Sequence, residues 1–581
     1  MSAELSEVVL VDQELISAYG KGVACCAEGL LENRRAFRPA GDGFAPALAA
    51  LPVGAVPAAG APEPEPASRL LALVRALFAD AGPVAPDTSV YVATTVGEID
   101  RLEAEVGAGA APSCESRLSL LPRRLAATLG VSEERVQVVS SACASSTAAL
   151  ALAASAIRRG ETSCALVVGC DLVSEFVLSG FAALMALDPD GAKPFDADRR
   201  GVTLGSAAAF ALLMSRERAV RERRTCLGVV GGWGMTCDAN HLTGPSRDGA
   251  PLAEAARAAL ALAGCPPEDV AALCAHGTGT VYNDQMELLA FKQLFGGRPL
   301  PTFSVKGGMG HTLGAAGVTE TLLALEFLRR GRIPPTVGLR HAAQEAHGWV
   351  SQSACPVSPQ GVVLTTNSGF GGVNAALALA LLPFPNAAPP RTDAAALHVA
   401  GRGAFSASTG ESLTNGAFAL PRNFGRFSAE SRRAFHAVMQ ALNEAGLTLD
   451  GNRFLRYRHE PAPVRAGVIA FDRDGSAAAN RAYYSDYVGS GRVLGRGQLF
   501  VYTLPTSVAA ECAIACHLTG PLLYVAEPDG GDGAARRAAR GLLADGLTDA
   551  VVLLSVTSEA AQASVVTAPK RTPLLSATSQ S

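Results

Sequence analysis

Short apolar runs that end in turn residues recur along the first two thirds of the chain and alternate with segments of helical periodicity. Such runs are typical of strands buried on both faces of a sheet. The clearest predicted strands are SVYVATT (89–95), VQVVSSA (136–142), CALVVGC (164–170), GVVLTTN (361–367) and NAALALALL (374–382). Helical patterns such as EPASRLLALVRALFADAG and TETLLALEFLRRG lie between them. The alternation predicts an α/β protein with helices packed on sheets in several layers.

The apolar pattern breaks at PFPNAAPPRTDAAA, residues 383–396, where prolines and polar turn residues cluster. Clusters of this kind mark loops and linkers. We therefore predict a first domain over residues 1–382, a linker over 383–396 and a second domain over 397–566. The last residues, 567–581, have the composition of a frayed tail.

The second domain repeats parts of the first in degenerate form. SRRAFHAVMQALNEAGL (431–447) is similar to SRLLALVRALFADAG (68–82), and GLLADGLTDAVVLLSV (541–556) is similar to SAIRRGETSCALVVGC (155–170). Gly546 then aligns with Gly160, an offset of 386 residues, and the same offset places Asp529 at the position of Cys143. We predict a degenerate repeat; the alternative is an unrelated accessory domain with common α/β patterning.

Composition narrows the class of protein. Apolar residues make up 49% of the 581 positions and charged residues 18%, as in a folded globular chain. The net charge of −4 and the lack of Lys/Arg-rich runs argue against a nucleic-acid partner. No apolar stretch reaches the roughly 20 residues that span a bilayer, and the first residues do not resemble a leader peptide. We predict a cytoplasmic protein with no membrane span.

Metal and nucleotide sites are not predicted. The 13 cysteines include no Cys-x-x-Cys pair, and no dinucleotide-binding glycine fingerprint follows a predicted strand. Most of these cysteines are expected to be small buried hydrophobes.

One cysteine has different surroundings. In VVSSACASSTAALALAASAIRRG, residues 138–160, Cys143 lies between small residues and an Ala-rich predicted helix. The unpaired N–H groups at a helix N-terminus lower the pKa of a nearby thiol, and the thiolate is the nucleophilic form. A lone cysteine in such a turn is more often a buried filler, so the functional interpretation depends on companion motifs.

Three further stretches supply those companions. CAHGTGTVYNDQME contains His276 and Glu287, SVKGGMGHTLGAAG contains Lys306 and His311, and TTNSGFGGVNAAL is a glycine-rich turn around Phe370. Each combines reactive side chains or glycines with a preceding apolar run, which is where α/β folds expose functional loops. Together they predict a site with one thiol and two imidazoles.

At this point residues 1 to about 385 resemble the β-ketoacyl-acyl carrier protein synthases of the thiolase-like superfamily, the KAS I/II type with a Cys-His-His triad. SACASS, HGTGT, KGGMGH with the following GAAG, and GFGG occur in the order of that family and at about its spacing. The second domain, 397–566, resembles a truncated ketosynthase N-terminal half. The resemblance implies a five-layered α-β-α-β-α fold, plus a smaller C-terminal α/β domain.

The resemblance also implies an activity and its residues. The expected reaction is decarboxylative Claisen condensation of an acyl group on Cys143 with malonyl-acyl carrier protein, with His276 and His311 as the other triad members. Lys306, anchored by Glu287, would set the local charge, and Phe370 would supply an oxyanion-hole N–H and a gate. Phe181 in SGFAALMALD is the expected second pocket residue.

The implied partners are an acyl carrier protein and either a second copy of the chain or a related ketosynthase subunit. The substrates would be carried on the phosphopantetheine of the carrier protein, with no other cofactor and no metal. Departures such as Ser368, where the family often has phenylalanine, favour specialised polyketide, aryl-polyene or unusual-lipid synthesis. Two alternatives stay open: acyl transfer without condensation, and a non-catalytic partner similar to a chain-length factor.

Overall fold

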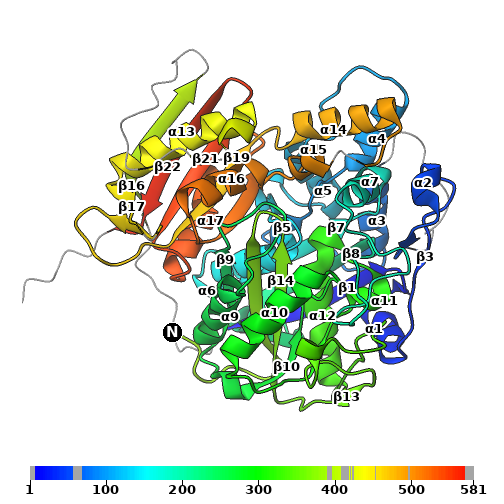
Figure 1. Ribbon diagram of the computed structural model, residues 1–581. Helices are drawn as coiled ribbons and strands as arrows, with labels where there is room; N and C mark the ends of the chain where they lie inside the picture. Colours follow the sequence, from blue (N-terminus) through cyan, green and yellow to red (C-terminus); the bar gives the residue numbers. More distant parts are fainter. Residues whose placement is uncertain are drawn as a thin grey trace, which may run out of the picture.

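The structure is a computed structural model that describes residues 7–56, 68–388, 396–406, 418, 421, 424–451, 453–494 and 497–569. Sixteen strands in this part of the chain belong to one hydrogen-bonded system. It runs from β11 (Thr302–Phe303) at one edge to β16 (His398–Ser406; labelled in Figure 1) at the other.

The first sheet of the large unit has the strand order β1-β8-β7-β5-β6. Its bounds are β1 Val8–Ser17, β5 Ser89–Ala93, β6 Val136–Ser140, β7 Cys164–Asp171 and β8 Ala207–Ser215. The strands β5, β6 and β7 are parallel to one another, whereas β8 is antiparallel to β7 and β1. Three of the five strands that the apolar runs predicted lie here.

The second sheet has the order β11-β10-β14-β15-β9, and β9 pairs with β1 of the first sheet. Its other bounds are β9 Gly228–Cys237, β10 Val270–Cys274, β14 Val362–Gly369 and β15 Val373–Ala380. The predicted strands GVVLTTN and NAALALALL are β14 and β15.

Helices cover both sheets and fill the space between them. One outer layer contains α3 (Arg69–Phe78) and α5 (Leu121–Leu129), and the opposite outer layer contains α9 (Ala250–Ala263) and α10 (Val281–Leu294). The central layer contains α6 (Ser145–Arg158) and α12 (Ala316–Arg329), which contact each other and strands of both sheets. The expected five-layered fold is thereby confirmed.

The sequence explains why α6 and α12 lie in the centre. A helix that is apolar on all sides is stable only when it is buried on all sides. Every residue of α6 is buried, and so is every residue of α12 except Arg329. A side chain at Gly317 of α12 would place a Cβ 2.1 Å from Oγ1 of Thr147 in α6. The missing Cβ therefore lets the two helices approach closely.

The smaller unit, residues 398–567 from β16 to β22, is called the C-terminal unit below. Its sheet has the order β20-β19-β21-β22-β16. The further bounds are β19 Ala466–Asp472, β20 Leu522–Ala526, β21 Ala550–Val556, β22 Ala560–Thr567, α13 Ala429–Glu444, α16 Ser507–Cys516 and α17 Gly533–Ala544. This order repeats β6-β5-β7-β8-β1 of the large unit, as expected for a domain that resembles a ketosynthase N-terminal half.

The two units are joined along strands and through helices. Strand β20 pairs with β6 of the large unit, and α17 contacts α6. Two more helices, α14 (Ala477–Ser490) and α15 (Gly497–Val501), extend from the C-terminal unit to α4 (Ile99–Gly107) and α7 (Glu175–Ala183) of the large unit (Figure 1). The exact limits predicted for the two domains, the linker and the tail stay a prediction.

The remaining elements are short or peripheral. They are α1 Val23–Leu31, α2 Pro46–Ala49, α8 Arg216–Arg221, α11 Lys306–Met309, β2 Gly20–Lys21, β3 Arg38–Pro39, β4 Pro52–Val53, β12 Arg332–Ile333, β13 Cys355–Pro356, β17 Leu447–Leu449 and β18 Leu455–Tyr457. Within the described ranges, none of the helices has the length and apolar character needed to cross a bilayer.

Candidate active site

Cys143 lies in the tight turn between β6 and α6. Ala142, just before it, has a φ of 48°, a left-handed backbone conformation that is uncommon for a residue with a Cβ. Ser145 holds this turn from inside the helix: its hydroxyl accepts the N–H of Ser141 at 2.8 Å and donates to the carbonyl of Ala142 at 2.5 Å. The turn is therefore fixed by local hydrogen bonds that place Cys143 at the start of α6.

The thiol of Cys143 is protonated in this structure. Burial raises its pKa to about 12, and the Lys306 ammonium opposes that shift only partly. The net pKa is raised, because desolvation of the thiolate, with the nearby Asp171 and Glu320 carboxylates, outweighs the favourable Lys306 charge. The resting nucleophile is therefore a thiol, and its proton must leave when sulfur reacts.

His276 follows β10, at the start of the HGTGT loop. Glu287 of α10 accepts the backbone N–H groups of His276 and Gly277, each at 2.6 Å, so a buried carboxyl group fixes the backbone of this loop. Burial raises the pKa of Glu287 to about 8. The nearby Asp284 accepts the N–H groups of Thr278 and Gly279 and is a structural residue of the same loop.

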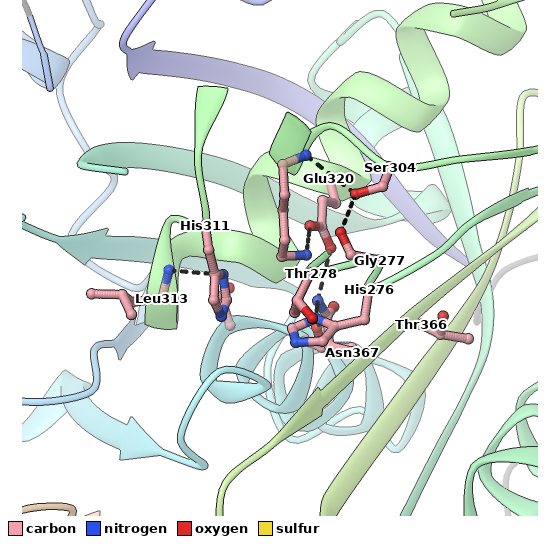
Figure 2. Close-up of polar contacts among 12 residues, drawn as sticks. His276, Gly277, Thr278, Ser304, His311, Leu313, Glu320, Thr366 and Asn367 are labelled. Carbon is pink, nitrogen blue, oxygen red and sulfur yellow. Dashed lines mark hydrogen bonds and ion pairs between the residues drawn. The ribbon is translucent and has the colours of Figure 1, made fainter. Parts of the chain in front are cut away.

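Lys306 and Glu320 form an ion pair that is completely enclosed, with side-chain exposures of 1% each. Asn367 continues this network, since its amide donates to Glu320 at 2.7 Å and to Nδ1 of His276 at 3.3 Å (Figure 2). The expected anchoring of Lys306 by Glu287 is wrong: Glu287 binds the loop backbone, and Glu320 of α12 pairs with the lysine.

The hydrogen bonds assign the proton positions of both histidines. His276 accepts from Asn367 at Nδ1, and His311 accepts from the N–H of Leu313 at Nδ1, at 3.3 Å (Figure 2). A neutral imidazole that accepts at Nδ1 carries its proton on Nε2. Nε2 of His311 is buried and has no partner among the described residues.

Both histidines are uncharged. Burial, followed by the charge of Lys306, holds the pKa of His276 and of His311 well below the ordinary range. Their rings lie close together, with centroids 5.1 Å apart and planes nearly perpendicular. The pair therefore offers two neutral N–H donors side by side.

The thiol and the two imidazoles line one cavity of about 410 Å³. Phe370 and Phe181 form part of its wall, with ring centroids 5.7 Å apart in a stacked arrangement. Met185 and Tyr282, which are 81% and 66% exposed, also line it. The structure thus brings together the predicted Cys143, His276, His311, Phe370 and Phe181 in one place.

Gly369 connects the Phe370 loop to the nucleophile turn. A Cβ on Gly369 would lie 2.8 Å from the backbone nitrogen of Cys143, so only glycine permits this approach. Consequently the loop that carries Phe370 lies directly against the backbone of Cys143.

Two contributors to the site were missed in the sequence. Glu320 is an acidic residue within the mostly apolar helical stretch AGVTETLLALEFLR, and a charge that becomes buried in such a stretch needs a partner. Asn367 links Glu320 to His276, and its position in GVVLTTN gives no hint of that contact. In the described part of the chain, His, Cys, Asp and Glu side chains form no cluster of three or more that could hold a metal ion.

Comparison with known proteins agrees with this geometry. Residues 61–219 match the family model "Beta-ketoacyl synthase, N-terminal domain", and residues 227–340 match "Beta-ketoacyl synthase, C-terminal domain". A curated relative, "3-oxoacyl-[acyl-carrier-protein] synthase 2" of Mycobacterium tuberculosis, is 32% identical over 269 residues, which are 44% of this chain and 64% of that protein.

Two solved structures are also similar. "The ishigamide ketosynthase/chain length factor" is 30% identical, with a TM-score of 0.59 over 64% of this chain and 98% of the other. "PfaC Keto synthase-Chain length factor" has a TM-score of 0.78 over 97% of this chain and 78% of the other, and its 15% identity supports likeness of fold alone. The chain belongs to the β-ketoacyl synthase family. It spans about 60% of the length of the curated relatives it matches.

Proposed function

We propose that the protein catalyses the condensation of an acyl group on Cys143 with a malonyl group on an acyl carrier protein, giving a 3-oxoacyl-carrier protein. One observation carries this proposal. A nucleophilic thiol and two neutral Nε2–H donors line the same cavity, in a chain of the β-ketoacyl synthase family. Neutral donors suit the stabilisation of a developing oxyanion, because their hydrogen bonds need no proton transfer.

The first half of the reaction loads the enzyme. The sulfur of Cys143 attacks the carbonyl carbon of an acyl thioester on the carrier, and the carbonyl oxygen becomes an oxyanion. The backbone N–H groups of Cys143 and Phe370 would stabilise this oxyanion. The carbon–sulfur bond to the pantetheine then breaks, and the pantetheine thiol leaves with the proton that Cys143 lost.

The second half forms the carbon–carbon bond. Malonyl-carrier protein loses carbon dioxide, and the electron pair of the broken bond forms an enolate whose oxygen accepts hydrogen bonds from His276 and His311. The enolate carbon attacks the thioester on Cys143. Collapse of the tetrahedral intermediate expels the cysteine thiolate, which takes a proton and returns to the resting thiol.

Lys306 and Glu320 act on this chemistry indirectly. The ammonium lies close enough to both imidazoles to lower their pKa, so it keeps them as neutral donors. Glu320 pairs with the lysine and orients Asn367, which in turn fixes the proton of His276 on Nε2. We propose these two residues as positioning residues and His276 and His311 as catalytic residues.

Phe181 and Phe370 would bound the acyl group. Their stacked rings form one wall of the cavity that contains the thiol. Phe370 follows Gly369 directly, so a change in this loop would move the wall and the proposed oxyanion donor together. We propose Phe370 as a gate and Phe181 as a pocket residue.

The other expectations from the sequence stay proposals at this point. They comprise the acyl carrier protein as partner, a cytoplasmic location, and the domain limits at residues 382, 396 and 566, whereas pairing with a separate ketosynthase subunit would compete with the contact that the C-terminal unit already makes on β6. Two of the similar solved structures, the ishigamide and PfaC structures, are a ketosynthase with a chain-length factor. Cys143 and both donors favour a catalytic chain over a non-catalytic partner.

The direct test is intact-protein mass spectrometry after incubation with acyl-carrier proteins, followed by malonyl-carrier protein, with Cys143→Ala as control. We expect a mass gain of one acyl group that the variant lacks. Malonyl-carrier protein should then remove it and yield a 3-oxoacyl-carrier protein. Loading without discharge would indicate acyl transfer alone, and a lack of loading would contradict the proposal.

A further inference from the structure

We infer that the C-terminal unit takes the place of a second subunit: it closes the sheet edge beside the nucleophile and positions the wall of the acyl pocket from within the same chain. The part that concerns the pocket rests on the proposed function.

Strands β6 and β20 are related by the internal repeat and pair with each other. The offset of 386 residues turns β6, Val136–Ser140, into β20, Leu522–Ala526. The two strands are antiparallel, with Val139 opposite Val525 and Ser140 opposite Tyr524. Val139 is thus opposite its own equivalent, so the two units meet around a local twofold axis. A contact of the same strand with itself around a twofold axis is the geometry of a symmetric homodimer.

The pairing of β20 with β6 occupies the edge of β6 through which a second copy of the chain would form a symmetric dimer. Strand β6 pairs with β5 on one side and with β20 on the other. A second copy of the chain therefore finds no unpaired β6 edge.

The sequence of helix α17 fits a helix that is covered on one face only. Its equivalent, α6, has a single charged residue, Arg158, and is buried on all sides. By contrast, α17 carries Arg536, Arg537 and Arg540, and Arg537 is exposed. An amphipathic helix is stable with one face in water. In the large unit, a second sheet covers the far side of α6. The C-terminal unit needs no such sheet, because the corresponding face of α17 is polar.

The C-terminal unit also contacts both loops of the site. The hydroxyl of Ser141, two residues before Cys143, donates to the carbonyl of Leu522 at 2.8 Å. A Cβ on Gly371, next to Phe370, would lie 3.2 Å from Cβ of Ala510 and 3.3 Å from Leu522. The nucleophile turn and the gate loop thus rest on residues of β20 and α16.

A second contact reaches the pocket wall. Phe500 of α15 packs edge-on against Phe181, with ring centroids 5.7 Å apart, and Phe181 stacks on Phe370. Gly180 makes room for this ring, because a Cβ there would lie 2.1 Å from Phe500. Next to it, the hydroxyl of Tyr483 in α14 is 2.8 Å from that of Ser179.

Phe500 does not line the cavity itself but lies behind Phe181. It therefore acts as a positioning residue: it prevents Phe181 from moving back when a longer acyl group enters. Removal of the Phe500 ring should deepen the pocket without touching the thiol or the histidines.

The first test is the mass of the intact chain in solution, by sedimentation equilibrium at micromolar concentration. We expect the mass of a single chain, 59.4 kDa. A mass of two chains would overturn the inference that the C-terminal unit replaces a second subunit. This measurement does not depend on activity, so it remains informative if the proposed function fails.

The second test compares the acyl groups that load onto Cys143 from carrier proteins with chains of increasing length. We expect Phe500→Ala to load chains at least two carbons longer than the wild type does, at an unchanged rate for the shortest chain. Leu499→Ala, on the same helix at a side chain 41% exposed, is the matched control and should keep the wild-type profile.

Phe500→Leu keeps an apolar side chain and serves as a second variant if Phe500→Ala does not fold. It should give a smaller shift of the length profile in the same direction. An unchanged length profile in both Phe500 variants, with normal loading of short chains, would overturn the role of Phe500. Failure of the wild type to load any chain would instead contradict the proposed function.

Discussion

The reactivity of Cys143 is set by two opposing effects on a single thiol. Burial raises its pKa to about 12, whereas the Lys306 charge favours the thiolate. The folded-state pKa lies above the ordinary value, so the thiol form persists at neutral pH and the thiolate fraction grows as pH rises. At neutral pH burial therefore keeps the free thiol in its less reactive, protonated form.

This predicts a specific pH dependence of alkylation. The rate of Cys143 modification by iodoacetamide should rise about tenfold per pH unit from pH 7 to about pH 10, because the thiolate is the reacting form. Mass spectrometry of the peptide that contains Cys143 gives the rate, and Cys143→Ala identifies signals from other cysteines. A plateau near pH 7 would mean that the thiolate is already formed in the resting protein.

The Lys306–Glu320 pair should be costly to break from one side. Glu320→Leu leaves a buried ammonium without its carboxylate, which typically costs about 3–5 kcal/mol of folding free energy. Lys306→Met combined with Glu320→Leu removes both charges and should recover most of that loss while activity stays low. Denaturant unfolding of the three proteins measures this, and equal losses in the single and double variants would contradict the buried-pair interpretation.

Among single residues, the sequence predicted the proposed reacting groups better than the residues that hold those groups in place. Cys143, His276, His311 and Phe370 lie in short motifs with glycines, so their local sequences carry the signal. Glu320 and Asn367 act through contacts between α12, β14 and the HGTGT loop. Such contacts depend on tertiary packing, and nothing in the local sequence around these residues specifies the partner.

Among the elements, the contact between α6 and α12 controls the position of the site. Helix α6 begins two residues after Cys143, and α12 provides Glu320. Gly317 of α12 lies so close to Thr147 of α6 that a Cβ would meet both its hydroxyl and its backbone nitrogen, at 2.1 and 2.4 Å. The spacing of these two helices is therefore fixed by the missing side chain.

Gly317→Ala should separate the helices and destabilise the protein by about 1–3 kcal/mol, as overpacking of a core does. Gly107→Ala is the matched control, because Gly107 is also a helical glycine and a Cβ there would meet no atom within 4 Å. The control should be neutral or slightly stabilising. Thermal unfolding of both variants provides the comparison, and equal midpoints would contradict the close packing of α6 on α12.

The elements of the large unit were predictable because continuous apolar runs mark strands buried on both faces. The predicted strands β5, β6, β7, β14 and β15 and the helices α3 and α12 are all present. The placement of α14 and α15 was not predicted, because their sequences carry no signal of the distant helices α4 and α7 that they contact. The apolar pattern of a segment predicts whether it forms a helix or a strand. The packing of one unit on another depends on the shapes of the two surfaces that meet.

The whole molecule has two related units but one nucleophile. The repeat places Asp529 at the position of Cys143, and Asp529 is exposed after β20. With an excess of acyl-carrier protein, loading should therefore saturate at one acyl group per chain, as measured by intact mass. Loading of two groups would indicate a second reactive site and contradict this assignment.

The unequal units explain how one chain can hold a complete site. The large unit supplies the cavity-lining Cys143, His276, His311 and Phe370, whereas residues of the C-terminal unit contact Ser141 beside the thiol and Phe181 in the cavity wall. The repeat itself could be inferred from sequence, but the pairing of β6 with β20 could not, since it depends on which edges of two sheets are free.

In the proposed mechanism Cys143 accepts the acyl group, and the Nε2–H groups of His276 and His311 stabilise the enolate that forms the new carbon–carbon bond. The most direct measurement is single-turnover discharge of preloaded acyl-Cys143 by malonyl-carrier protein, in the wild type, His276→Ala and His311→Ala. We predict loading within a few fold of wild type in all three. Discharge should be slower by roughly 10²–10³ in each histidine variant, the usual effect of losing one oxyanion donor. Discharge at the wild-type rate in either variant would contradict the account.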